Sequence, residues 1–175
     1  MSRLLGIAER IDSLTIGVGR AAAWLYPLLV LVLLVNVVAR YGFGVGSIEL
    51  EEFQWHLYAA AFLLGLAYTY ATDEHVRVDI LAGRLATRTR LWIELLGALL
   101  LLAPFAGIAT FHAWEFFWQS FALGERSPMP SGLPARWVIK GILFASLALL
   151  SLQAVSAAAR AAAQLASTPA RRRSP

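Results

Sequence analysis

Residues 21–39, AAAWLYPLLVLVLLVNVVA, hold no charged side chain and decide how the chain must fold. A helix of this length crosses the hydrocarbon core of a bilayer, roughly 30 Å thick, because a helix satisfies its own backbone amides in lipid. Three further apolar runs of comparable length occupy residues 53–71, 91–111 and 137–158. The sequence therefore predicts an all-α integral membrane protein with four transmembrane helices.

The composition of the whole chain agrees with a lipid environment. Of its 175 residues, 59% are hydrophobic and only 15% are charged, a balance that is unusual for a soluble protein. The net charge of +4 does not indicate nucleic-acid binding, because the arginines lie between the apolar runs rather than on one folded basic face. The absence of cysteine excludes disulfides, thiolate metal sites and a cysteine nucleophile.

Positive residues at the ends of the runs predict the orientation, because Lys and Arg favour cytoplasmic loops. Most of them precede the first run, lie between the second and third, or follow the fourth, at Arg3, Arg10, Arg20, Arg77, Arg84, Arg88, Arg90, Arg160 and Arg171 to Arg173. The opposite side holds Arg40, Arg126, Arg136 and Lys140. We therefore expect both termini and the middle loop in the cytoplasm. We also expect the first run to be an uncleaved anchor, since it is longer than the apolar region of a signal peptide.

The segment before the first run has a helical pattern of its own. Apolar residues recur there at spacings of three and four, at Leu4, Ile7, Ala8, Ile11, Leu14 and Val18. Polar residues, Asp12 among them, fall on the opposite face. The pattern predicts either a short amphipathic helix on the inner membrane surface or an extension of the first transmembrane helix.

The end of the chain differs in composition from the rest. Residues 161–175 are rich in Ala, Ser, Pro and Arg, which predicts a disordered basic cytoplasmic tail attracted to anionic lipid head groups. Residues 1–160 then form a single four-helix membrane domain.

Charged residues flank the first outer loop. Asn36 and Arg40 stand four residues apart and share one helix face, and Glu51 and Glu52 open the second helix. Because charges near the membrane usually face protein, we expect Arg40 to pair with Glu51 or Glu52 and so close this hairpin. The alternative is that Arg40 extends alone to the membrane surface.

Two histidines raise the question of a cofactor. His56 and His112 lie near the outer ends of the second and third helices, with Glu52 and Glu115 about one turn away. Two imidazoles are able to ligate haem, and with two carboxylates they are able to hold a metal. The spacing does not match the Glu-x-x-His pairs of di-iron bundles, and interfacial aromatic belts collect such residues. We expect no catalytic residue, cofactor or metal, and keep a haem-bearing anchor of a redox enzyme as the alternative.

The middles of the four runs lack Asp, Glu, Lys and Arg. The sequence also lacks the broken helix pair that binds ions and substrate in secondary transporters, and it has no phosphate loop or nucleophile elbow. We therefore expect neither an enzyme nor a self-sufficient channel or exporter.

Three motifs in order resemble one transporter family. They are Asn36-x-x-x-Arg40-Tyr41, then Glu51-Glu52 with Trp55, then His75-Val76-Arg77-Val78-Asp79. This arrangement resembles the DctQ-type small membrane subunit of TRAP transporters, the tripartite ATP-independent periplasmic family.

The resemblance implies a complex in the bacterial inner membrane. A periplasmic binding protein captures an organic acid, a large permease subunit transports it together with a coupling ion, and the small subunit is a fixed scaffold. The residues expected to pack against the large subunit are Asn36, Arg40, Glu51, Glu52, Trp55, His75, Arg77 and Asp79. The outer loop at residues 124–136, which includes Arg126, is expected to contact the binding protein.

Overall fold

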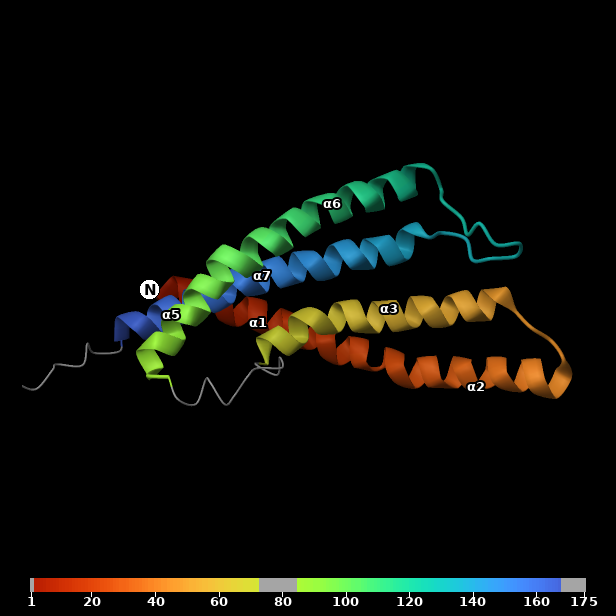
Figure 1. Ribbon diagram of the computed structural model, residues 1–175, viewed down its shortest axis with the longest axis horizontal. Coiled ribbons are helices and arrows are strands. Elements are labelled where there is room, and N and C mark those ends of the chain that lie inside the picture. The colour runs from red at the N-terminus through yellow and green to blue at the C-terminus, as the bar shows by residue number, and fades with distance from the viewer. Residues whose placement is uncertain (1, 73–84, 168–175) are drawn as a thin grey trace, which may run out of the picture.

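The computed structural model describes residues 2–72 and 85–167, and every regular element within these ranges is helical (Figure 1). The all-α fold class is confirmed for this part of the chain. The helices are α1 (Ser2–Ala23), α2 (Leu25–Phe43), α3 (Ile48–Ala71), α5 (Thr87–Gly97), the π-helix η1 (Ala98–Leu102), α6 (Ala103–Ala122) and α7 (Trp137–Ser167).

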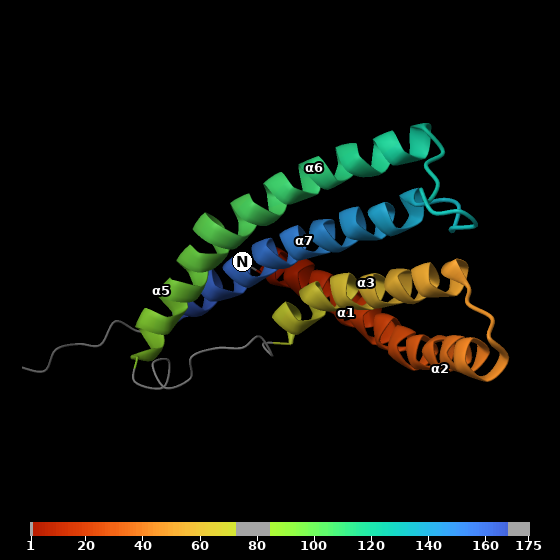
Figure 2. The same cartoon turned by 45° about the vertical axis from the view of Figure 1, so that its right-hand side comes forward.

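The helices form an elongated bundle around α7. Helices α1, α3, α5 and α6 all pack against α7, and α2 packs against α3 (Figures 1 and 2). The α2–α3 turn and the α6–α7 loop lie at one end of the bundle, which we call the outer end. The start of α1, the start of α5 and the end of α7 lie at the other, inner end.

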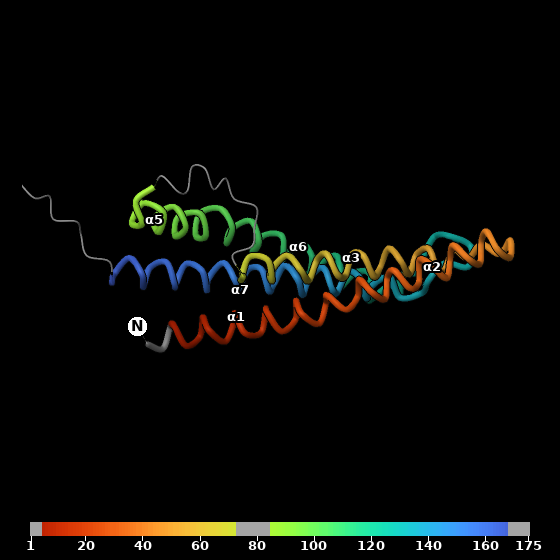
Figure 3. The backbone as a smooth tube through the Cα atoms, turned by 90° about the horizontal axis from the view of Figure 1, so that it is seen from below, coloured from red at the N-terminus to blue at the C-terminus, as the bar shows by residue number. Residues whose placement is uncertain are grey.

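Two pairs of helices continue into one another. Helix α1 leads into α2 through Trp24, whose backbone is itself right-handed helical, so the two follow one long path (Figure 3). Helices α5 and α6 are joined by the five-residue η1, which lies just before Pro104. A proline inside a helix removes one backbone hydrogen bond and crowds the preceding turn, and the wider π-helical turn accommodates it.

Three described segments are long and apolar enough to cross a membrane: Leu5–Phe43, Thr87–Ala122 and Trp137–Ser167. They contain the expected spans at 21–39, 91–111 and 137–158. The expected span at 53–71 lies in α3, which is not among them because polar residues such as Gln54 and His56 lower its mean hydropathy. Four spans remain a prediction on account of this helix.

The core of the bundle consists mainly of small side chains. Ala67, Ala106 and Leu150 bring α3, α6 and α7 together, and nearer the inner end Ala98 packs against Ala157 and Ala158. Small residues let helix backbones approach closely, which is how helices associate in lipid, where no hydrophobic force drives them together.

Helix α1 belongs to the bundle. Its residues Ala8, Thr15 and Ala22 are buried against the neighbouring helices. Helix α1 therefore packs on the other helices, and its position at the membrane surface or within the first span stays a prediction. Asp12, which the periodicity placed on the water-facing side, instead faces α7. This part of the prediction was wrong because α7 provides polar partners that the local pattern of α1 does not reveal.

Helix α7 continues beyond the predicted domain boundary at residue 160. Residues 161–167, which we expected in the disordered tail, are helical, and Ala161 is buried. The run of alanines from residue 157 explains the difference, since alanine has the highest helix propensity.

Candidate subunit-contact sites at the two ends of the bundle

The start of α3 positions the acidic residues of the outer end. Ser47 caps this helix, and its hydroxyl accepts a hydrogen bond from the Leu50 amide at 3.2 Å. Glu49 and Glu51 then fall in the first turn, where the positive end of the helix dipole favours negative charge.

The first hairpin is closed by an ion pair between Arg40 and Glu51. The pairing expected for Arg40 is therefore present, with Glu51 as the partner and Glu52 engaged elsewhere. Both side chains remain partly exposed, at 45% and 36%. Asn36, one turn below Arg40, is buried, and its Oδ1 atom has no hydrogen-bond partner among the described residues. Trp55 is exposed about two turns into α3.

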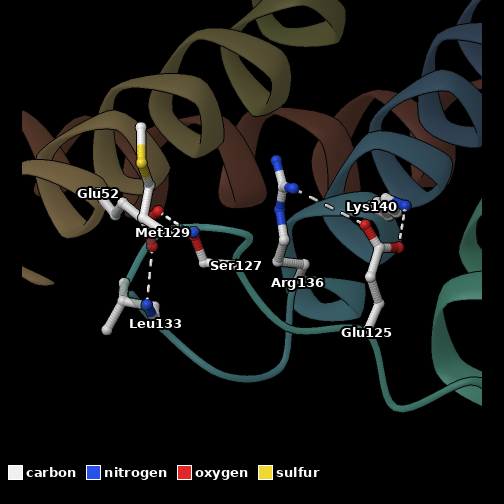
Figure 4. A network of polar contacts seen from close by, with 7 residues as sticks. All are labelled: Glu52, Glu125, Ser127, Met129, Leu133, Arg136 and Lys140. Carbon is white, nitrogen blue, oxygen red and sulfur yellow. Dashed lines mark hydrogen bonds and ion pairs between the residues drawn. The ribbon is translucent and has the colours of Figure 1, made fainter. Parts of the chain in front are cut away.

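Glu52 fastens the outer loop to α3 (Figure 4). Its carboxylate accepts hydrogen bonds from the Ser127 hydroxyl and, at 2.7 Å, from the Leu133 amide. Gly132 permits this contact, because a Cβ atom there would overlap the Ser127 side chain and lie 3.1 Å from Glu52 Oε1. We call the contacts of Glu52 with Ser127 and Leu133 the outer clasp.

A second carboxylate ties the loop to α7. Glu125 pairs with Lys140, and its Oε1 atom lies 3.8 Å from Arg136 Nη1 (Figure 4). Lys140 also lies 3.8 Å from the centre of the Phe116 ring, in a cation–π contact. Arg126, the residue chosen from the sequence, is exposed next to this pair.

These contacts shift the titration of the two carboxylates that hold the outer loop, Glu52 on α3 and Glu125 within the loop. Hydrogen bonds from Ser127 and Leu133, with a smaller contribution from nearby Arg136, hold the pKa of Glu52 below its ordinary value. The hydrogen bond from Lys140 likewise lowers the pKa of Glu125. The loop is thus held by carboxylates that stay ionised at neutral pH.

A separate polar network lies nearer the inner end, between α1 and α7. Asp12 accepts hydrogen bonds from Gln153 Nε2 at 2.7 Å and from the Ser156 hydroxyl at 2.9 Å, and it forms an ion pair with Arg160. Thr15 donates to Gln153 Oε1 at 3.2 Å. We call these contacts the inner network.

The neutral members of the inner network are almost sealed from solvent, whereas the side chains of Asp12 and Arg160 are 18% and 31% exposed. Gln153 is completely buried, and Thr15 and Ser156 are each 1% exposed. Sequence reasoning missed these residues, although a signal was present. Gln153, Ser156 and Arg160 recur at spacings of three and four and so share one face of α7, which marks a polar stripe on an otherwise apolar helix.

The two histidines are engaged in contacts within their own helices. His56 Nδ1 lies 2.6 Å from the Glu52 carbonyl oxygen, and His112 Nδ1 lies 3.3 Å from Glu115 Oε2. In the outer half of the bundle α7 runs between their helices, α3 and α6 (Figures 1 and 2). Within residues 2–72 and 85–167, no cluster of three or more His, Asp or Glu side chains is placed to hold a metal. The structure gives the haem-anchor alternative no support.

His75, Arg77 and Asp79, the most distinctive part of the predicted contact set, lie outside the described residues. Their expected role in subunit contact is untested.

Comparison with known families identifies a family whose sequence model matches most of the chain. Residues 29–164 match the sequence model of a family described as tripartite ATP-independent periplasmic transporters, DctQ component. The match includes the Arg40–Glu51 pair, the outer clasp and the α7 side of the inner network, but not Asp12. No curated protein and no solved structure matches the chain significantly.

Proposed function

We propose that the chain, which belongs to the DctQ component family of tripartite ATP-independent periplasmic transporters, is the non-catalytic small membrane subunit and scaffolds the large permease. The observation that supports a scaffold best is the internal pairing of the charged groups that hold the helices together. Asp12, Glu52 and Glu125 each bind partners within the chain and fix one helix or loop to another. Groups used in this way stabilise a rigid body and have little freedom to bind and release a moving solute.

The proposal includes the class of cargo and the orientation. The complex takes up an organic acid together with a coupling ion, and a periplasmic binding protein delivers the acid. The small subunit lies in the bacterial inner membrane with four spans, of which α3 is one. The distribution of arginines supports cytoplasmic termini.

Two surfaces are assigned to two partners. The α2–α3 hairpin, with Asn36, Arg40, Glu51 and Trp55, contacts the permease, as do His75, Arg77 and Asp79. The outer loop with Arg126 contacts the binding protein. The clasp on Glu52 and the pair on Glu125 support the second assignment, because a loop held in one conformation loses less entropy on binding.

Copurification tests the permease partnership. A tagged chain expressed with the neighbouring large hydrophobic permease should recover that permease in mild detergent. Arg40→Glu should reduce the recovery, and the matched control Glu9→Lys, a charge reversal on the exposed side of α1, should leave it unchanged. Recovery of no permease by the wild-type chain would contradict the function.

The assignment of the hairpin has its own test. The exchanged variant Arg40→Glu with Glu51→Arg restores the intrachain ion pair while reversing the charges that a partner meets. If the permease contacts these charges, recovery stays low in the exchanged variant. Full recovery would show that the pair acts only within the chain and would overturn the assignment.

A further inference from the structure

The inner half of the bundle has a hollow on its surface. A groove of about 600 Å³ lies beside the end of α3, along the rod formed by α5, η1 and α6. Its volume is within the roughly 300–1,000 Å³ of small-molecule sites. Nothing in the transporter role described above uses it.

Small residues make the hollow. Gly97 and Ala98 lie in its lining, and Ala98 is itself buried against α7. A Cβ atom on Gly97 would meet no other atom within 4 Å, so space is open above this residue. The π-helix begins at Ala98, and such wide turns often occur at functional sites.

The groove is apolar along its length and charged at one end. Ile93, Leu101 and Phe105 line it, and the last two are 72% and 65% exposed. Arg90 and Glu94 also line it, and Arg90 lies seven residues before Gly97, roughly 10 Å along the helix. With Arg88 nearby, the formal charge at this end is two positive and one negative, or +1.

We propose that this groove binds one anionic phospholipid of the inner leaflet. An acyl chain lies against Leu101 and Phe105 above Gly97, and the phosphate lies near Arg90. The lining of the groove changes along its length as a phospholipid requires. It is apolar toward the middle of the segment Thr87–Ala122, and Arg90 lies at its inner end. Basic pockets between membrane helices on the cytoplasmic side recognise anionic head groups in this way. The leaflet rests on the proposed orientation, whereas the site does not depend on the permease partnership.

Native mass spectrometry of the purified full chain tests the site with two defined lipids. The chain is mixed in detergent with dioleoylphosphatidylglycerol or dioleoylphosphatidylcholine, and bound lipid is counted. We expect one retained phosphatidylglycerol per chain. Gly97→Phe should lower the retention of phosphatidylglycerol about tenfold, because the added ring would overfill the space that the acyl chain occupies.

Gly107 offers a matched control. It is exposed on α6, a Cβ atom there also meets nothing within 4 Å, and it does not line the groove. Gly107→Phe adds the same ring to the same segment and should leave retention unchanged. Equal loss in both variants, or no retained lipid in the wild type, would overturn the proposal.

The head group is tested separately. Arg90→Gln should reduce the preference for phosphatidylglycerol over phosphatidylcholine about fivefold, because phosphatidylglycerol carries a net negative charge that zwitterionic phosphatidylcholine lacks. Arg88→Gln, outside the lining, should have a smaller effect. An unchanged preference in Arg90→Gln would overturn the head-group assignment. Lipid bound by the isolated chain but missing from the chain copurified with permease would identify the permease as occupant and overturn the site.

Discussion

The inner network on Asp12 and the outer clasp on Glu52 use the same chemistry in different surroundings. Each joins segments that are far apart in sequence through a carboxylate that accepts several hydrogen bonds. Gln153 and Ser156, the neutral partners of Asp12, are almost completely buried and the Arg160 side chain is 31% exposed, whereas the partners of Glu52 belong to a loop at the bundle surface.

This difference predicts different roles. A buried charge that loses its partner keeps its desolvation cost, so each member of the inner network is needed for α1 to stay on α7. An exposed charge that loses its partner regains water, so the outer clasp contributes little to folding and mainly fixes the shape of the loop. The inner end should therefore determine stability, and the outer end should determine how the loop is presented.

The largest expected effect comes from the inner network. Asp12→Ala leaves Arg160 charged and partly buried without its partner, and we expect a loss of about 3 kcal/mol in the free energy of unfolding. Thermal unfolding in detergent measures it.

Two controls isolate the cause. Glu9→Ala removes a neighbouring acid on the exposed side of α1 and should change stability by less than about 0.5 kcal/mol. The double variant Asp12→Ala with Arg160→Ala removes both charges and should be more stable than Asp12→Ala alone. A double variant that is less stable would contradict a buried charge as the source of the loss.

The second-largest expected effect comes from the close packing of α1 on α3. A Cβ atom on Gly19 would overlap the Cβ of Tyr68, so Gly19→Ala should cost about 2 kcal/mol. Gly17→Ala is the matched variant. Its Cβ meets nothing within 4 Å, and the change should stabilise the helix by about 0.5–1 kcal/mol. Melting temperatures that move in the same direction would argue against close packing of α1.

The Arg40–Glu51 pair should contribute little to the stability of the isolated chain. Because both side chains are partly exposed, a double-mutant cycle should give a coupling energy of about 0.5 kcal/mol. A value above about 2 kcal/mol would show that the outer end is as desolvated as the inner network, and the contrast between the two ends would fail.

The smallest expected effect is faster proteolysis of the outer loop at low pH. Since the pKa of Glu52 is lowered by folding, its contribution is present above the ordinary pKa of a glutamate and is lost as pH falls through the lower folded value. Limited proteolysis of the outer loop should therefore accelerate in acid, below about pH 4. Glu52→Gln should show fast proteolysis already at neutral pH and little further change. A wild-type loop with the same cleavage rate at both pH values would contradict the clasp.

The sequence revealed contacts between segments that are close along the chain. The Arg40–Glu51 pair was predictable because a short turn must bring the two helix ends together. The contact between Asp12 and Arg160, 148 residues apart, was not predictable, since the local pattern placed Asp12 toward water. Pro128, Pro130, Pro134 and Gly132 predict an irregular outer loop, but its attachment to Glu52 depends on how two hairpins pack. The sequence predicted a helix over residues 53–71, and α3 contains it, but the polar residues of α3 keep it out of the segments that are apolar enough to cross a membrane.

The most direct test of the membrane arrangement uses the absence of cysteine from the chain. Single cysteines replace Gly46 in the α2–α3 turn, Ser131 in the outer loop and Ala86 just before α5, all exposed positions. A membrane-impermeant maleimide added to spheroplasts should label Gly46→Cys and Ser131→Cys, and it should label Ala86→Cys only after lysis. Labelling of Gly46→Cys and Ala86→Cys from the same side would show that α3 does not cross the membrane and would contradict the four-span scaffold.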